Sequence, residues 1–452
     1  MKKLITLLLM VLSLQMFGQC FQKISASNNF TIAIKADGTL WGWGNNADGQ
    51  CGDGTNSTRI VPTQIGTSGN WGSFDTGDFH TIAIKANGTL WAWGNNRFGQ
   101  LGDGTNTNRN VPTQIGTANN WKSVDGGWNH TVAIKMDGTL WAWGYNDSGQ
   151  LGEGTYINKN VPTQIGTSVN WGSVAAGAFH TIALKTDGTL WAWGANPGRF
   201  GNGTNTNSLV PIQIGTDTNW KNVSTGLGHT IALKTDGTLW AWGDNDTGQL
   251  GDGTNTDRNV PTQIVSITNW KSVDVGDMHT IAIKTDGSLW TWGRNNSTQL
   301  GDGTNINKNV PTHIESATNW QYVAGGGNHS FAIKTDGSLW AWGNGYLLGD
   351  GTSNASNVPK AIVCPTSVLA VDDFEVTNEM KIYPNPIKDI LNFSFDAAIT
   401  TVSIYNLLGQ EVIVKSLNAN EGTIDVSNLS SGTYFVKVYA DNLVRTLKVI
   451  KK

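Results

Sequence analysis

The sequence predicts an all-β chain in which a seven-bladed β-propeller, with four-stranded blades of about 50 residues each, is followed by a small β-sandwich. Three observations lead to this fold class. A Trp-x-Trp pair occurs seven times, first at Trp41 and Trp43, at successive spacings of 50, 50, 50, 49, 50 and 50 residues. Each unit is rich in Gly and in strand-forming residues, and none shows the apolar period of a helix. A fixed period of this length is typical of repeat architectures.

The third unit illustrates the first two strands of each repeat. Residues 121–124 form a first short run, which Gly126 and Gly127 end. Residues 131–135 alternate between two faces, as in a strand of a sheet. Asp137-Gly138 follows and predicts a two-residue type I′ hairpin turn, because that turn needs a positive φ at both central positions.

The second half of the unit supplies the other two strands. Residues 140–143 place both Trp side chains on one face of a third strand, since alternate residues point the same way. A Gly-rich loop, 144–160, leads to a fourth strand that Val161 and Pro162 open, a position that suits Pro. One such sheet has two bare faces, so seven sheets in a ring would bury the Trp and Ile faces between neighbours.

The repeated residues resemble a known family. The pattern G-x-x-H-[TS]-x-A-[IL]-K-x-[DN]-G-[TS]-L-W-x-W-G-x-N, followed by G-Q-L-G-[DE]-G-T, is similar to the regulator-of-chromosome-condensation repeat over residues 21 to about 363. The resemblance implies a seven-bladed propeller but no particular function, since fold does not imply function. Two units depart from the pattern, at 194–201 and 343–349, and both changes fall in loops.

Residues 1–19 are predicted to be a secretory signal peptide. Lys2 and Lys3 precede an apolar run, 4–16, which is too short to span a bilayer. Cleavage after Gln19 would leave Cys20 as the first residue of the mature chain. Acylation of Cys20, as in a lipoprotein, is the alternative, which a Gln just before the Cys disfavours.

The three cysteines indicate how the ring closes. By alignment with the third unit, Cys20 takes the place of Asn120 and Cys364 takes the place of Thr117, on the two sides of a link between blades. In a closed ring these positions meet where no peptide joins the last blade to the first, so we expect a Cys20–Cys364 disulfide. In the chain-entropy model it would stabilise the fold by about 4–5 kcal/mol. Two free thiols are the alternative. Cys51 stands where other units have Leu and is expected to be a buried thiol.

The composition changes after residue 364, which divides the chain into a propeller at 20–364, a linker at 365–380 and a C-terminal domain at 381–452. Alternating runs and turn signals in the last part predict a small β-sandwich. This part resembles the type A C-terminal sorting domain of the type IX secretion pathway. The resemblance implies the secretion machinery as a partner, and release or attachment outside a Gram-negative bacterium. The matching motif residues are Tyr383, Pro384, Asn385, Pro386, Gly409 and Gly432.

Composition and motifs exclude several classes of function. Only 14% of residues are charged and the formal net charge is −4, which argues against a nucleic acid or an anionic membrane as partner. The sequence contains no transmembrane segment, nucleophile elbow, zinc motif or phosphate loop. We therefore expect no catalytic residues, no metal site and no cofactor, and we predict that the protein is not an enzyme.

Residues that recur in every unit are expected to build the blade. Six units carry a His in the same frame, for which we predict a hydrogen-bonding role rather than a metal site. An acidic residue recurs in Gly-x-Gly-Thr, without the spacing of a calcium loop, so we predict turn chemistry. His313 and Glu315 could form an acid–base pair, but a solvated strand face is the simpler interpretation. The histidines are His80, His130, His180, His229, His279 and His329, and the repeated acidic residues include Asp53, Asp103, Glu153, Asp252, Asp302 and Asp350.

Residues that vary between units mark a candidate binding face. In an up-and-down blade, the turn between strands one and two lies at the same end as the loop between strands three and four. This end is diverse and carries aromatic and Arg side chains, the usual ingredients of binding hot spots, whereas the other end is monotonous. Drift of exposed loops is the alternative. The candidate binding residues are Asp78, Phe79, Arg97, Phe98, Trp128, Asn129, Tyr145, Phe179, Arg199, Asp277, Met278, Arg294, Asn328 and Tyr346.

These observations predict a secreted or cell-surface, non-catalytic propeller that binds an extracellular protein or glycan through its variable loops. Trp128 is the strongest candidate, because an exposed Trp serves recognition well. The alternative is an extracellular hydrolase of polysaccharide or peptide, which would need two close carboxylates. Asp78 and Asp277 are the only candidates, and they are four units apart. The resemblance also raises nucleotide exchange, as in the family's eukaryotic namesake, but export would separate the chain from a cytosolic GTPase.

Overall fold

The computed structural model describes residues 20–265, 268–365, 381–440 and 443–452. The predicted signal peptide, 1–19, and almost all of the predicted linker lie outside the described residues. Contacts divide the chain into two compact units, Met1–Val368 and Leu369–Lys452. Within the described part, no helix has the length and apolar character needed to cross a membrane.

The first unit consists of seven four-stranded sheets, one per repeat. The first strands are β1 (Phe21–Ala26), β5 (Trp71–Thr76), β9 (Trp121–Gly126), β13 (Trp171–Ala176), β17 (Trp220–Thr225), β21 (Trp270–Val275) and β25 (Trp320–Gly325). The second strands are β2 (Phe30–Lys35), β6 (His80–Lys85), β10 (His130–Lys135), β14 (His180–Lys185), β18 (His229–Lys234), β22 (His279–Lys284) and β26 (His329–Lys334). The third strands are β3 (Leu40–Gly44), β7 (Leu90–Gly94), β11 (Leu140–Gly144), β15 (Leu190–Gly194), β19 (Leu239–Gly243), β23 (Leu289–Gly293) and β27 (Leu339–Gly343). The fourth strands are β4 (Arg59–Ile65), β8 (Arg109–Gln114), β12 (Lys159–Gln164), β16 (Ser208–Ile214), β20 (Arg258–Gln263), β24 (Lys308–Ile314) and β28 (Ser356–Ile362).

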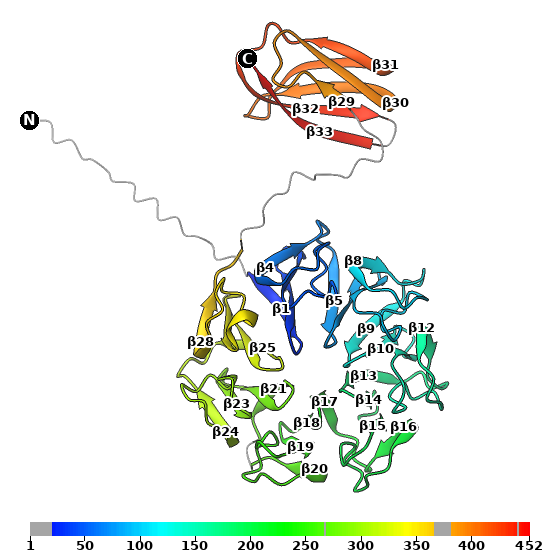
Figure 1. The fold of residues 1–452 in the computed structure, drawn as a ribbon, viewed down its shortest axis with the longest axis vertical. Coiled ribbons are helices and arrows are strands. Elements are labelled where there is room, and N and C mark those ends of the chain that lie inside the picture. The colour runs from blue at the N-terminus through cyan, green and yellow to red at the C-terminus, as the bar shows by residue number, and fades with distance from the viewer. Residues whose placement is uncertain (1–19, 266–267, 366–380, 441–442) are drawn as a thin grey trace, which may run out of the picture. The chain divides into compact units, whose positions relative to one another are not determined.

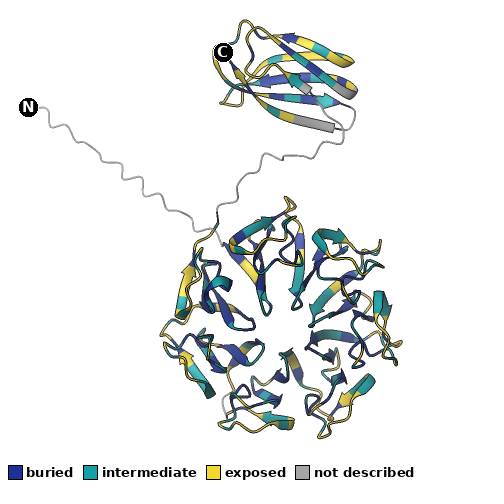
Figure 2. Ribbon diagram, viewed as in Figure 1, coloured by how far each residue is buried: buried dark blue, intermediate teal, exposed yellow. Residues whose placement is uncertain are grey.

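The sheets form the blades of a ring, which the chain visits in order (Figure 1). Each blade contains the four strands of one repeat, paired antiparallel in sequence order. The second strands, such as β10, are almost fully buried, whereas the outermost strands, such as β12, are partly exposed (Figure 2). A short 3₁₀ helix, η1 (Gly345–Leu347), occupies the shortened loop of the seventh blade. The predicted seven-bladed fold is therefore confirmed.

The hairpin between the second and third strands differs from the predicted type I′ turn. In the third blade, the amide of Gly138 donates to the carbonyl of Lys135 at 2.9 Å. A positive φ, 80°, falls on Gly138 but not on Asp137. The Oδ1 atom of Asp137 accepts hydrogen bonds from the amide and the hydroxyl of Thr139, at 3.0 and 2.7 Å. Because this local bonding holds Asp137 at negative φ, the turn is type I followed by a glycine bulge.

Tryptophans fill the spaces between blades. Trp143 is fully buried and packs in one cluster with Ile82 and Leu90 of the preceding blade. Trp121 meets it edge to face, with ring centroids 5.9 Å apart. At the monotonous end of the same blade, the ammonium of Lys135 lies 3.8 Å from the centroid of the Trp141 ring, a cation–π contact. Equivalent contacts recur around the ring, so the repeated Trp and Lys residues build the blades.

The repeated histidines connect six of the seven blades to the next, since the first blade has Phe30 at this position. Each is fully buried, and its Nε2 atom lies within hydrogen-bond distance of a hydroxyl group on the following blade. Burial lowers the pKa of five of them to about 3, so these imidazoles are neutral. The pairs are His80–Thr131 at 2.8 Å, His130–Thr181 at 3.2 Å, His180–Thr225 at 2.8 Å, His229–Thr280 at 3.4 Å, His279–Ser330 at 2.7 Å and His329–Thr31 at 3.3 Å.

The repeated acidic residues close loops. In the second blade, Oδ1 of Asp103 accepts hydrogen bonds from the amide and hydroxyl of Thr105, at 2.9 and 2.7 Å. Its Oδ2 atom forms an ion pair with Arg109 at 2.7 Å. Both oxygens are thus engaged within the loop, which is the turn chemistry that the spacing indicates. His313 and Glu315 do not pair with each other, because His313 packs against Trp290 and Glu315 faces Lys334 at 3.4 Å.

The ring closes between the seventh and first blades without any exchange of strands. Phe21 and Trp43 of the first blade pack in one cluster with Phe331 of the seventh. Cys20 and Cys364 form a disulfide there, with Cα atoms 5.7 Å apart. A sulfur held in this bond is not available for acylation. The remaining cysteine, Cys51, is buried and free.

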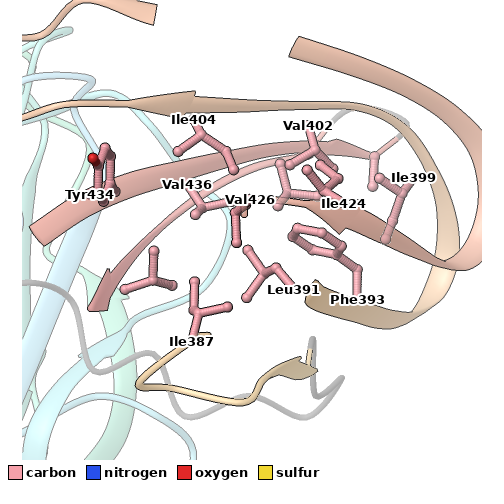
Figure 3. Close-up of a cluster of buried hydrophobic side chains, with 13 residues drawn as sticks. Ile387, Leu391, Phe393, Ile399, Val402, Ile404, Ile424, Val426, Tyr434 and Val436 are labelled. Carbon is pink, nitrogen blue, oxygen red and sulfur yellow. The ribbon is translucent and has the colours of Figure 1, made fainter. Parts of the chain in front are cut away.

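The second unit is a single curled sheet. Its strands are β29 (Lys381–Tyr383), β30 (Ile390–Tyr405), β31 (Glu411–Asp425), β32 (Gly432–Ala440) and β33 (Leu443–Lys451). The long β30 pairs with β29, β31 and β32, and β33 continues the sheet beyond β32. The sheet curls around an apolar core that includes Leu391, Phe393 and Val436 (Figure 3). The two layers expected of a sandwich are therefore parts of one hydrogen-bonded sheet.

The motif residues of the second unit tie its loops to this sheet. Asn385 lies between Pro384 and Pro386, accepts a hydrogen bond from the amide of Ile450 at 2.9 Å and donates one to the carbonyl of Lys448 at 3.2 Å. The segment after Tyr383, which ends β29, is thereby held against β33. Gly409 adopts a φ of 77° in the hairpin turn before β31, and Gly432 is the first residue of β32.

Candidate functional site

The variable turns and loops share one end of the propeller. In each blade, the residue that opens the loop between strands three and four donates a backbone hydrogen bond to the turn between strands one and two. In the third blade, the amide of Tyr145 donates to the carbonyl of Asn129 at 2.9 Å. In the second and seventh blades, Asn95 and Asn344 donate in the same way to the carbonyls of Phe79 and Asn328. We call this end the variable-loop face.

Four predicted aromatic residues form a row across three blades of this face. The rings of Phe98 and Tyr145 have centroids 4.8 Å apart, and those of Tyr145 and Phe179 are 6.4 Å apart. Trp128 meets Phe179 edge to face at 5.0 Å. Arg97 extends the row outward, with its guanidinium carbon 5.5 Å from the centroid of Phe98. We call Phe98, Tyr145, Phe179 and Trp128 the aromatic row.

Trp128 is less accessible than the sequence suggested. The prediction treated it as exposed, but its side chain is only partly accessible because it packs against Phe179 and forms part of the wall of the central channel. The Nε1 atom of Trp128 is buried and has no hydrogen-bond acceptor among the described residues. Several tryptophans between the blades, such as Trp121 and Trp171, share this feature, so the unpaired N–H alone does not set Trp128 apart.

Five of the remaining predicted residues have side-chain partners of their own. Arg199 forms an ion pair with Asp244 at 3.2 Å, so its charge is already compensated. The guanidinium of Arg294 lies 3.5 Å from the sulfur of Met278. The side chain of Asn129 accepts from Gln100 at 3.3 Å, and the hydroxyl of Tyr346 donates to Asn29 at 3.3 Å. These contacts make the face rigid, and they do not join the aromatic row.

A central channel runs along the first strands, and the sequence did not point to it. It has a volume of about 490 Å³ and is lined by all seven first strands and by the turns that follow them. Three carboxylates project into it at one strand position, from Asp75, Asp125 and Asp274. Other blades carry Ser or Ala at that position, as at Ser25 and Ala175, which hid the pattern.

These three carboxylates connect neighbouring blades. Asp75 accepts hydrogen bonds from the hydroxyl of Ser25 at 2.7 Å and from the amide of Gly126 at 2.9 Å. Asp274 accepts from the equivalent groups, the hydroxyl of Ser224 at 2.8 Å and the amide of Gly325 at 3.0 Å, and Asp125 accepts from the amide of Ala176 at 2.7 Å. Burial raises the pKa of Asp75 to about 6, despite the opposing hydrogen bonds. The channel is thus acidic, but these groups are committed to the fold.

Asp78 and Asp277 lie at the end of the channel on the variable-loop face. They are four units apart in the sequence, and the prediction treated that separation as distance. Across the narrow ring, however, they interact: burial raises the pKa of Asp78 well above its usual value, and the charge of Asp277 raises it further. Burial also raises the pKa of Asp277 to about 6, although Arg294 opposes this shift. Two carboxyl groups whose charges interact therefore line the mouth of the channel.

Comparison with family models identifies both parts of the chain. A model of the RCC1-like domain matches residues 127–376. Models of the regulator of chromosome condensation (RCC1) repeat match 37–84 and 87–134, and also 21–50 and 73–100. A model of the secretion system C-terminal sorting domain matches residues 381–452.

Solved structures support the same fold. Human WBSCR16 superposes with a TM-score of 0.64 at 22% identity, over 69% of this chain and 86% of that chain. Prp20p from Saccharomyces cerevisiae superposes with a TM-score of 0.66 at 22% identity, over 75% of this chain and 88% of that chain. At such identity the likeness is one of fold. No curated protein gives a significant match.

Proposed function

The chain belongs to the RCC1-like domain family and ends in a type IX C-terminal sorting domain, and from this premise we propose that it is an exported, non-catalytic propeller that binds a protein outside the cell. The binding site is the variable-loop face, centred on the aromatic row and the mouth of the channel. The aromatic row is the observation that carries this proposal. It gathers Phe98, Tyr145, Phe179 and Trp128 from loops of three blades, and aromatic residues dominate the energetics of protein interfaces.

A protein partner fits the row better than a glycan does. Sugar recognition favours an aromatic ring that offers an open face, whereas Trp128 and Phe179 meet at an interplanar angle of 88° and are both partly buried. Arg97 beside Phe98 adds the second residue type that is enriched in hot spots. Prp20p, whose structure was reported with its binding to Gsp1p and histones, is a precedent for protein binding by this fold.

Capture from culture medium and outer-membrane extract tests the proposal. The mature chain from residue 20 is used as bait beside a Trp128→Ala, Phe179→Ala double variant. A matched control is Met136→Ala, which removes a side chain that is 65% exposed at the opposite end of the third blade. We expect a protein that both the wild type and the control retain. The double variant should retain at least about tenfold less of it. Equal retention by all three would contradict the proposal, and a retained glycan would change the class of ligand.

A second candidate function rests on the coupling of Asp78 and Asp277. A polysaccharide or peptide hydrolase needs a pair of carboxyl groups with different roles, and this pair lies in an open channel mouth. Incubation of the chain with polysaccharide and peptide libraries tests this function. Hydrolysis by the wild type that is lost in Asp78→Asn and in Asp277→Asn would favour the enzyme. Hydrolysis that persists in both variants would exclude this pair as its site.

A further inference from the structure

We propose that the mouth of the channel on the variable-loop face receives a lysine or arginine side chain carried by a loop of the protein partner. Two polar atoms without hydrogen-bond partners among the described residues line the mouth, the Oδ2 atom of Asp78 and the Nε1 atom of Trp128. A basic residue in an extended loop offers both complements, a cationic donor at the end of its side chain and a carbonyl acceptor in its main chain. This inference rests on the proposed binding function and names the partner's chemistry at its centre.

The acidic pair supplies the negative end of the site. The Oδ2 atom of Asp78 is buried and accepts no hydrogen bond from the described residues. Asp277, from across the ring, is close enough for its charge to raise the pKa of Asp78, although burial has the larger effect. Asn28 donates hydrogen bonds to Asp78 and the charge of Arg294 acts on Asp277, but the Oδ2 atom of Asp78 stays unpaired and two neighbouring carboxylates repel each other. A cation placed between them relieves both effects.

The carboxylates deeper in the channel add to the electrostatic attraction for a cation, but they do not contact it directly. Asp75, Asp125 and Asp274 already accept hydrogen bonds from the next or preceding blade. Among the described residues that line the cavity, Lys23 is the single lysine or arginine, and it belongs to the half of β1 away from the mouth. A narrow channel with one predominant sign of charge focuses the field, so an approaching cation is drawn to the mouth.

The aromatic row supplies the other contacts. Phe179 packs against Trp128 at an interplanar angle of 88°, and the buried N–H of Trp128, which has no acceptor among the described residues, would donate to a main-chain carbonyl of the partner. The hydrocarbon stem of a lysine or arginine would pack along the ring while its charged end reaches the acids, as long basic side chains commonly do. The cavity volume of about 490 Å³ suits a side chain and a short stretch of loop, not a folded domain.

Nuclear magnetic resonance of the mature chain tests the inference with a defined probe. The probe is N-acetyl-arginine N-methylamide, and N-acetyl-citrulline N-methylamide is its uncharged isostere. The chain is labelled with ¹⁵N-tryptophan, and the indole signal of Trp128 is assigned by its loss in Trp128→Phe. Measurements at pH 8 keep the acidic pair more ionised than at neutrality. We expect the arginine probe to shift the Trp128 signal saturably, with the citrulline probe binding about tenfold or more weakly.

Matched variants identify the acids as the recognition element. An Asp78→Asn, Asp277→Asn double variant keeps the shape of both side chains and should weaken binding of the arginine probe about tenfold or more. Asp246→Asn removes the same charge from an exposed loop position on the same face and should change the affinity less than about twofold. Equal binding of both probes, unchanged binding by the double Asn variant, or no shift of the Trp128 signal would each overturn the inference.

The two proposals fail in different ways. If the captured protein is lost by Trp128→Ala, Phe179→Ala but kept by the double Asn variant, the binding face stands and the basic-residue inference is wrong. If no protein is captured while the arginine probe binds at Asp78 and Asp277, the mouth recognises cations and the proposed binding function is wrong.

Discussion

Each buried histidine holds its blade against the next as a neutral imidazole. His130 is fully buried, its Nε2 atom lies 3.2 Å from the hydroxyl of Thr181, and burial lowers its pKa to about 3. The same residue in the unfolded chain titrates near its ordinary pKa of about 6.5. Because the folded pKa is the lower one, the stability that the neutral imidazole contributes is present above about pH 6.5 and is lost as the pH falls towards 3.

A substitution at this residue should therefore matter less in acid. We expect His130→Asn to destabilise the propeller by about 1–3 kcal/mol at pH 7.5, because it breaks the buried hydrogen bond to Thr181, whose hydroxyl keeps only its bond to the carbonyl of Gln150. At pH 5.5 the difference from the wild type should shrink by about 1 kcal/mol, since one pKa unit corresponds to about 1.4 kcal/mol. Denaturant unfolding at both pH values measures this.

His313→Asn is the control for this experiment, because His313 is exposed. Its effect on the free energy of unfolding should be small. A destabilisation by His130→Asn that is the same at pH 7.5 and 5.5 would mean that the imidazole is not held neutral.

At the scale of single residues, the sequence predicted the roles of residues that recur in the blades. It did not reveal the roles of residues that vary between blades. The histidines and the tryptophans recur in frame, so their structural role could be inferred from position alone. Asp75, Asp125 and Asp274 share one strand position with Ser and Ala in other blades, which left no periodic signal. Neither the partial burial of Trp128 nor the interaction of Asp78 with Asp277 could be inferred, because both follow from the width of the ring.

Among the elements, the hairpin between the second and third strands is the most uniform. Its Gly residue takes a positive φ in the blade, as at Gly138 with 80°, and an added Cβ there would clash with the carbonyl oxygen of Val169 in the link to the next blade. Gly166 also has a positive φ, 60°, but a Cβ there would meet nothing within 4 Å. The sequence predicted this hairpin correctly but not its turn type, because Asp137 bonds locally to Thr139 and stays at negative φ.

The two glycines provide a matched pair of substitutions. We expect Gly166→Ala to destabilise the propeller by about 1 kcal/mol, the strain of a positive φ alone. Gly138→Ala should destabilise it by at least about 2 kcal/mol more, because the backbone of the link must also move. Thermal unfolding of both variants measures the difference. Equal effects of the two substitutions would show that the link yields freely and does not fix the hairpin.

Across the whole molecule, ring closure depends on packing and on one covalent bond. Every blade is complete within one repeat, so no strand is shared between the seventh and first blades. The seam is held by the cluster around Phe21 and Phe331, by the His329–Thr31 contact and by the Cys20–Cys364 disulfide. The period of the sequence was enough to predict the number of blades, since a regular repeat dictates a regular structure. The central channel and the acidic residues that line it could not be predicted from the period.

Loss of the disulfide should loosen the seam. The bond joins residues 344 positions apart, and in the chain-entropy model closing so long a loop stabilises the fold by about 5 kcal/mol. We expect Cys364→Ser, or a reductant added to the wild type, to lower the denaturant midpoint accordingly. The reductant should leave the Cys364→Ser variant unchanged, which is the control. Equal stability of the wild type with and without reductant would contradict this role.

The disulfide also decides how the propeller carries a mechanical load. Tension applied through the chain beyond residue 365 would, without this bond, peel β28 from β27 one hydrogen bond at a time, starting at the edge of the seventh blade. With it, force arriving at Cys364 passes directly to Cys20 at the start of β1, the innermost strand of the first blade. The outer strand is bypassed, so a pull on the chain beyond Cys364 is borne by a covalent bond and by β1, the innermost strand of the first blade.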